Sequence, residues 1–378
     1  MSEPLMAAAG AAATTQTRCP SCGTEVATTE RFCEACGAPL TPTADVTPLG
    51  PDGAESPVEL SRPVTPSATA TTSATVAATV AAPCVSCGGE VGEDGYCTTC
   101  GTKAASPRDH YVEQPASWVA ACCDRGIRHT RNEDATAIAA DEMPGSRAVL
   151  VVCDGVSTST DSDVAALAGA RSARDVLVAS QPTGLGVAAS RAAALAQALG
   201  TATAQANAAV IANTAPESDN AASCTFAAAV LEKGLVVYGN VGDSRVYWLP
   251  DPGAGDPLEL SLDDSVAQVR IAMGVPRAEA ENGPQAHAIT KWLGRDSPDI
   301  SPRTGSVELH VPGWLMVCSD GLWNYCSAAP DLQALVATTS AQTGGAPLPL
   351  AQALVAWANA QGGRDNISVA LARHSPVS

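Results

Sequence analysis

Apolar and polar positions follow two different patterns along the chain. From about residue 115 onward, short apolar runs such as VLVVC, WLMVCSD and NISVALA predict buried strands separated by Ala-rich stretches. Residues 161–180, 187–213 and 348–360 carry apolar side chains at helical spacing and predict helices. The run LVVYGNVGDSRVYWL predicts two short strands around a Gly-Asp turn. This part is therefore predicted to be one α+β domain.

The N-terminal hundred residues lack this alternation. Residues 41–82 are rich in Thr, Pro, Ala and Ser without an apolar period, which predicts a disordered linker. The N-terminus shows no basic segment followed by a Leu-rich core, and no apolar run approaches the roughly 20 residues of a membrane helix. We therefore expect a cytoplasmic protein without a membrane partner.

Eight of the 14 cysteines lie in the first 100 residues as four C-x-x-C pairs. They form two similar modules, at residues 17–40 and 83–103, each with two C-x-x-C-G knuckles around a short hairpin. Four thiolates suit tetrahedral zinc, and modules of this size, which resemble zinc ribbons, need metal to fold. Disulfides are the alternative, disfavoured because nothing indicates export. The predicted ligands of two structural zinc ions are Cys19, Cys22, Cys33 and Cys36, and Cys84, Cys87, Cys97 and Cys100.

The formal net charge is -18, from 21 basic and 39 acidic residues. Residues 1–110 alone hold 5 basic and 12 acidic residues. This balance repels nucleic acid, so we expect the ribbons to contact protein partners instead. An acidic protein that handles phosphate needs positive charge from elsewhere, and metal ions are one source.

Acidic residues stand where the predicted strands meet loops. A single Asp-Gly pair is ordinary turn chemistry. Several converging carboxylates, however, repel each other unless cations bind between them, and oxygen ligands suit magnesium or manganese. The candidate ligands are Glu133, Asp134, Asp154, Gly155 through its carbonyl, Asp243, Asp320 and Asp365.

The motifs RNEDA, CDGVS, SCTFAAAV, GNVGDSRVY, SDGLW and GRDNISVAL follow one another as in a known family. Their order resembles the metal-dependent protein phosphatases, the type 2C Ser/Thr family. The resemblance implies a β-sandwich of two antiparallel sheets flanked by helices, at residues 112–374, with a binuclear Mn/Mg site at one end. It also implies hydrolysis of phospho-Ser or phospho-Thr by a metal-activated water. The substrates would be phosphoproteins made by a Ser/Thr kinase.

The resemblance also assigns roles within the acidic set. Asp154 is expected to bridge both metals, with Gly155 offering its carbonyl. Asp320 and Asp365 are expected to bind one metal and, with Asp154, to be the catalytic residues. The remaining implied ligands are Glu133 and Asp134, which support the other metal largely through waters, and Asp243, which belongs to a weaker third metal site.

The chain departs from the family pattern in three places. His129 stands where the family usually has the Arg that grips the substrate phosphate, so Arg128 or His129 is expected to make that contact, or the contact is weakened. Ser157 replaces a Gly, which stiffens the loop beside the metals. Ser223-Cys224-Thr225 replaces Gly-Thr-Thr without removing a ligand.

Two functions compete on these observations. The first is a working phosphatase, and the alternative is a catalytically weak, phosphatase-like scaffold that binds protein partners through its ribbons. His129 slightly favours the scaffold. The complete Asp set favours the enzyme more, because a scaffold has no need of clustered, repelling carboxylates. His287 is left outside the core site, and Trp323 is expected to pack in the core.

Overall fold

The computed structural model describes residues 16–18, 25–27, 83–84, 86–181 and 186–376. The chain divides into two compact units, Met1–Ala77 and Ala78–Ser378. The described residues of the first unit form one antiparallel pair, β1 (Gln16–Arg18) with β2 (Glu25–Ala27). Outside the described residues lie the predicted linker 41–82 and the first predicted zinc ligands, Cys19, Cys22, Cys33 and Cys36.

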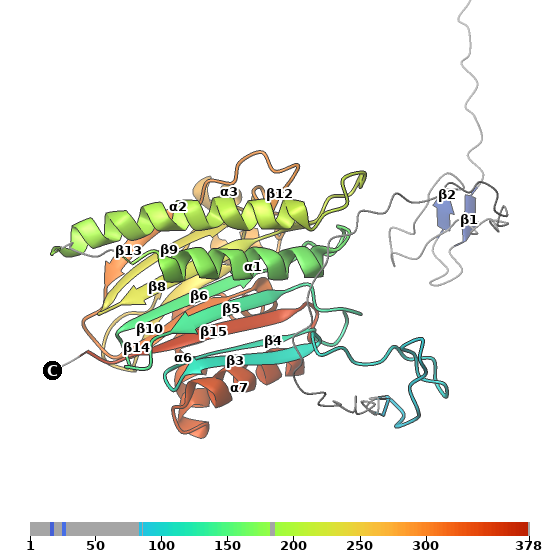
Figure 1. Ribbon diagram of the computed structural model, residues 1–378, viewed down its shortest axis with the longest axis horizontal. Helices are drawn as coiled ribbons and strands as arrows, with labels where there is room; N and C mark the ends of the chain where they lie inside the picture. The colour runs from blue at the N-terminus through green and yellow to red at the C-terminus, as the bar shows by residue number, and fades with distance from the viewer. Residues whose placement is uncertain (1–15, 19–24, 28–82, 85, 182–185, 377–378) are drawn as a thin grey trace, which may run out of the picture. The chain divides into compact units, whose positions relative to one another are not determined.

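Two antiparallel sheets form the main part of the second unit (Figure 1). This confirms the predicted sandwich. The six-stranded sheet has the order β11 (Leu258–Glu259), β10 (Arg245–Pro250), β14 (Gly313–Cys318), β15 (Ile367–His374), β4 (Val119–Asp124) and β3 (His110–Ala116). The five-stranded sheet has the order β13 (Arg303–Glu308), β9 (Leu235–Val241), β8 (Phe226–Glu232), β6 (Arg147–Cys153) and β5 (Ala135–Ala140). A short pair joins β7 (Ser223–Cys224) to β12 (Leu293–Gly294).

Helices cover the outer face of each sheet (Figure 1). α1 (Ser162–Ala179) and α2 (Ala188–Ala212) pack on the five-stranded sheet. α6 (Ala329–Gln342) and α7 (Pro347–Ala360) pack on the six-stranded sheet. The three predicted helices correspond to α1, α2 and α7 and are confirmed, whereas α6 was not predicted. The described residues also form three short helices: α3 (Val266–Ala272), α4 (Arg277–Glu281) and α5 (Asp320–Trp323).

Among the described residues, no helix combines the length and the apolar character needed to cross a membrane.

The central strands are apolar on both faces because the other sheet covers one face and helices cover the other. All seven residues of β6 are buried, and after Arg147 its sequence is a continuous apolar run rather than an alternation. Leu150 and Val152 point into the layer between the sheets, while Val149 and Val151 pack under α1 and α2. The scarcity of aromatic residues therefore reflects a core of small and branched side chains.

The turn between β9 and β10 crosses from one sheet to the other. These two strands were predicted around a Gly-Asp turn, and the structure assigns them to different sheets. Gly242 adopts φ 94°, and a Cβ there would lie 2.8 Å from a methyl carbon of Thr225. Only glycine suits such a position. The crossing leaves Asp243 at one end of the sandwich, between the sheets.

Candidate functional site

Strand ends from both sheets meet at this end of the sandwich. Ala135 pairs with Cys153, so Asp134 and Asp154, which adjoin these strand ends, stand close together. In the other sheet, Cys318 pairs with both Arg245 and Val369. This register brings the loops that carry Asp243, Asp320 and Asp365 to the same end. The sequence-predicted acids thus gather from five separate segments.

Hydrogen bonds join the strand ends of the two sheets at this end, and one of them reaches an acidic side chain. The Ser319 hydroxyl, at the end of β14, donates to Asp134 Oδ2 over 2.7 Å. The other oxygen of Asp134 is buried and has no hydrogen-bond partner among the described residues, and the same holds for Asp320 Oδ1. Unpaired buried carboxylate oxygens are costly unless a donor or a cation meets them.

The acidic side chains disturb one another's ionisation. Burial and the negative charges of neighbouring carboxylates raise the pKa of Asp154 and of Asp320 well above the ordinary range. Burial raises the pKa of Asp134 to about 7, and burial together with Asp263 raises the pKa of Asp243 to about 7. This end of the sandwich therefore resists full ionisation by itself, and divalent cations would reverse that resistance.

Glu133 behaves differently from the four aspartates. Its carboxylate accepts hydrogen bonds from Ser162 Oγ (2.8 Å) and from Arg131 (2.7 Å). Burial acts to raise the pKa of Glu133, but hydrogen bonds from His129, Ser162 and Arg131 outweigh it and hold the pKa at about 2. Glu133 is therefore a fixed anion that orients its neighbours.

His129 lies beside the acidic cluster, whereas Arg128 is exposed next to it. The His129 ring faces Glu133 through Nδ1 (3.6 Å) and Asp365 through Nε2 (3.3 Å). The interaction with Glu133 raises the pKa of His129, against an opposing effect of burial. The backbone N–H of Arg128 donates to Gly363 O over 3.1 Å, which ties this loop to the segment before Asp365.

The glycines of the two Asp-Gly pairs are required by close packing. A Cβ on Gly155 would lie 2.6 Å from Glu133 O, and a Cβ on Gly321 would collide with Asn366 O. Loops that bring carboxylates together thus approach at backbone distance. Position 155 therefore requires glycine for a steric reason, in addition to the expected role of its carbonyl as a metal ligand.

Sequence reasoning missed the residues that hold these loops. The side-chain oxygen of Asn366 accepts the Glu133 N–H (2.7 Å), and its amide donates to Arg125 O and Arg131 O. The Ser319 hydroxyl accepts the Ser368 N–H over 2.9 Å. Their only sequence signal was adjacency to Asp320 and Asp365.

The second cysteine module has a compact thiol cluster. The sulfurs of Cys84, Cys87, Cys97 and Cys100 all lie within 4.8 Å of one another. In the described part of the chain this holds for no other set of three His, Cys, Asp or Glu side chains. Separations of 3.3–3.6 Å between sulfur atoms lie close to the roughly 3.8 Å expected around zinc with 2.3 Å bonds. Backbone N–H groups of Ser86 and Thr99 point at Cys84 and Cys97, each over 3.4 Å.

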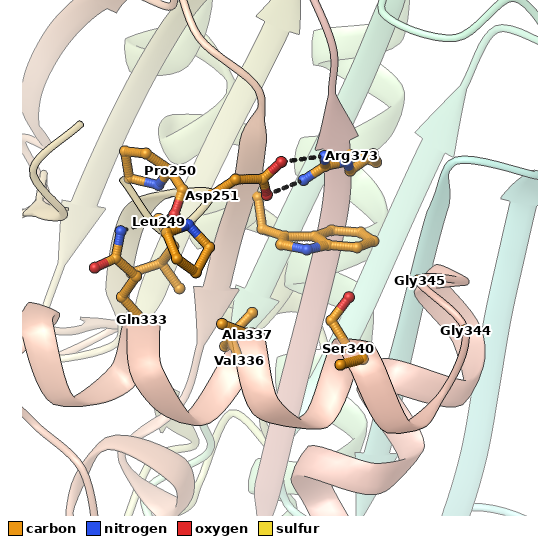
Figure 2. Close-up of a pocket in the computed structure, with 13 residues that line it drawn as sticks. Leu249, Pro250, Asp251, Gln333, Val336, Ala337, Ser340, Gly344, Gly345 and Arg373 are labelled. Atoms are coloured by element: carbon orange, nitrogen blue, oxygen red, sulfur yellow. Dashed lines mark hydrogen bonds and ion pairs between the residues drawn. The ribbon is translucent and has the colours of Figure 1, made fainter. Parts of the chain in front are cut away.

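A cavity of about 500 Å³ lies between α6 and the far ends of β10, β14 and β15, and Figure 2 shows the residues that line it. Trp314, Val336 and the ion pair of Arg373 with Asp251 line it. Trp314 is the second residue of β14, whereas Asp320 follows the end of that strand. This cavity is therefore separate from the acidic cluster.

Comparison with known protein families shows to which family the chain belongs. A family model described as Protein phosphatase 2C matches residues 125–358, more than half of the 378 residues. The chain belongs to the protein phosphatase 2C family. A zinc-ribbon domain model matches residues 18–40. The recognition made from the ordered motifs is thus confirmed.

Curated relatives in this family share moderate identity with the chain. Protein phosphatase PhpP of Streptococcus pneumoniae is 33% identical over 140 residues, which are 36% of this chain and 51% of the relative. Serine/threonine phosphatase stp of Listeria monocytogenes is 29% identical over 153 residues, 40% of this chain and 57% of the relative. The chain thus spans about half the length of the curated relatives it matches.

Solved structures of serine/threonine phosphatases share the fold. The Mycobacterium tuberculosis serine/threonine phosphatase PstP/Ppp has a TM-score of 0.54 at 23% identity, covering 70% of this chain and 99% of that one. Serine/threonine phosphatase Stp1 of Staphylococcus aureus has a TM-score of 0.56 at 22% identity, covering 68% and 95%. These similarities establish the sandwich architecture.

Proposed function

We propose that this chain is a metal-dependent protein Ser/Thr phosphatase that hydrolyses phospho-Ser and phospho-Thr in proteins. The observation that carries the proposal is the acidic end of the sandwich. There, Asp134 and Asp320 each keep a buried carboxylate oxygen without a hydrogen-bond partner among the described residues. A protein that retains such groups benefits only if a cation or a reacting molecule meets them.

The donor set fits two hard divalent ions, Mn²⁺ or Mg²⁺. All donors are oxygens, as these ions prefer. When bound, the ions supply the positive charge that activates a water nucleophile and neutralises phosphoryl oxygens. In our proposal Asp154 bridges the ions and Gly155 offers its carbonyl. The other proposed donors are Asp320 and Asp365 for one ion, Asp134 and Glu133 for the other, and Asp243 for a third.

His129 is our proposed contact for the substrate phosphate, with Arg128 beside it. Glu133 and Asp365 face the two ring nitrogens, and the interaction with Glu133 raises the pKa of His129, which favours its cationic form. A protonated imidazole has two N–H donors for anionic oxygens. It is shorter than the Arg of the family pattern, so the contact is expected to be weaker.

We further propose that each cysteine module holds one structural zinc ion. The four-sulfur cluster of the described module fits tetrahedral zinc, and the repeated spacing extends this to the first module. We also propose that the ribbons bind protein partners and that the substrates are phosphoproteins made by a Ser/Thr kinase. The proposed location is the cytoplasm. The acidic balance of residues 1–110 favours proteins over nucleic acid as partners.

One observation favours the scaffold as a second candidate. Both ring nitrogens of His129 face carboxylates, so the residue at the phosphate position is already engaged. If that engagement persists with substrate present, hydrolysis is slow and the domain acts through binding.

Phosphate release from a phosphothreonine peptide tests the proposal. Wild type and Asp320→Ala are compared with Mn²⁺, with Mg²⁺ and after chelation, and Asp175→Ala on the exposed face of α1 is the matched control. We expect metal-dependent release that the Asp320 variant loses and the Asp175 variant keeps. No release from folded wild type under any metal condition would favour the scaffold.

A further inference from the structure

A groove of about 650 Å³ opens beside the acidic cluster. One wall is formed by residues 278–287, including Glu281 and His287. The floor is formed by α5 and the residues after it, including Trp323 and Ser327. Arg364 and Asp365 also line the groove. Because Asp365 belongs to the acidic cluster, a phosphopeptide substrate whose phosphate lies at the cluster would extend along this groove.

A buried arginine attaches the wall to the body of the domain. The Arg245 side chain is only 2% exposed and its Nη2 lies 2.9 Å from Glu281 Oε1, at the end of α4. The same Nη2 lies 2.7 Å from Asp263 Oδ2. Arg277, at the start of α4, binds Glu281 (2.9 Å) and Glu259 (2.5 Å). The wall is thus held by a network of two guanidinium groups and three carboxylates.

The same arginine also contacts the groove floor. Its guanidinium carbon lies 3.6 Å from the ring centre of Trp323, a cation–π distance. The Trp323 indole N–H donates to Asp243 O over 2.9 Å. Ser327 Oγ donates to the second oxygen of Glu281 over 2.7 Å. Trp323, expected to pack in the core, is buried and forms this floor as well.

We infer that Arg245 and Glu281 form a latch that sets the width of the groove, and that Glu281 is a positioning residue for peptide substrates. This inference rests on the proposed function for its substrate class. Loss of Glu281 releases the wall from Arg245 and Ser327, while Asp263 and Glu259 still balance the two guanidinium groups. The pair of Arg277 with Glu259 keeps only the start of α4 attached. The domain is therefore expected to fold without the latch, with a wall that moves.

The test compares Glu281→Ala with Glu232→Ala. Glu232 is a matched control because it also pairs with a buried arginine, Arg147, and its side chain is 15% exposed against 12% for Glu281. For a phosphothreonine peptide, we expect Glu281→Ala to raise KM about tenfold with kcat within about twofold. Glu281→Gln keeps an acceptor for the guanidinium groups and is expected to fall between the two. The control is expected to match wild type in KM.

A second readout does not depend on activity. Backbone hydrogen exchange of residues 277–287 in metal-free protein is expected to accelerate in Glu281→Ala and, less, in Ser327→Ala, but not in Glu232→Ala. Unchanged exchange in the Glu281 and Ser327 variants overturns the latch, as does an equal KM change in the Glu232 control. If wild type releases no phosphate, the proposed function fails, and the exchange result alone decides the latch.

Discussion

The thiol cluster and the acidic cluster are two candidate metal sites built in opposite ways. The four cysteines lie within residues 84–100, and short turns bring their sulfurs within 4.8 Å. The acidic donors span residues 133 to 365 and stand at the ends of strands from two sheets. The thiol module has almost no apolar core, whereas the sandwich has buried layers between and outside its sheets. Metal should therefore fold the first site and only complete the second.

The largest expected effect is the loss of the second cysteine module on zinc removal. Because structural zinc contributes about 10 kcal/mol or more to such modules, a strong chelator should abolish hydrogen-exchange protection in residues 84–103 of the full chain. Strands β4, β6 and β15 should stay protected. Cys97→Ser should act like the chelator, and Cys326→Ser, away from the cluster, should not.

If residues 84–103 kept their hydrogen-exchange protection after chelation, the cysteine module would not need metal to fold, and the two sites would not differ in this respect. A mass consistent with two disulfides in that module would then favour the alternative of oxidised cysteine pairs.

The next effect concerns the acidic cluster. Asp154→Asn should lower phosphatase activity by at least about 10²-fold, since it removes the proposed bridging donor. The chelated variant should nevertheless be more stable to urea than the chelated wild type, because burial and repulsion raise the pKa of Asp154. Asp175→Asn is the control for both measurements. A less stable chelated Asp154→Asn would mean that the carboxylate is needed to build the sandwich.

In metal-free protein, the acidic cluster should make the free energy of unfolding depend on pH, an effect smaller than the preceding one. Burial raises the pKa of Asp134 to about 7, so the folded state holds a proton that the unfolded state loses near pH 4. Stability should therefore fall as pH rises from 5 to 7, by about 2 kcal/mol for this group. Urea unfolding in chelator at several pH values measures the slope, which Asp134→Asn should reduce. A slope of opposite sign would contradict the assignment.

The smallest expected effect is at the phosphate contact. His129→Arg should lower KM for a phosphothreonine peptide by up to about tenfold, because a guanidinium reaches farther and binds phosphate through two donors. Steady-state kinetics of the variant and of Arg128→Gln separate the two candidates. An unchanged KM in both would place the phosphate contact on another residue.

Much of the fold was predictable because its signals are local. The helices α1, α2 and α7 showed apolar spacing over at least three turns, and β6 is apolar because both its faces are buried. α6 was not predicted. The assignment of β9 and β10 to different sheets also had no local signal, since the turn at Gly242 resembles that of an ordinary hairpin.

The sequence by itself determined the family, the four cysteines that gather in the second module and the identity of the acidic candidates, because ordered motifs and short spacings carry that information. Tertiary structure alone decided how these acids meet. Ser319 reaches Asp134, and Asn366 reaches the backbone of Glu133, across more than a hundred residues. The tertiary structure alone also placed Arg245 in contact with both Glu281 and Trp323. Such contacts depend on strand register and sheet packing, which no local pattern encodes.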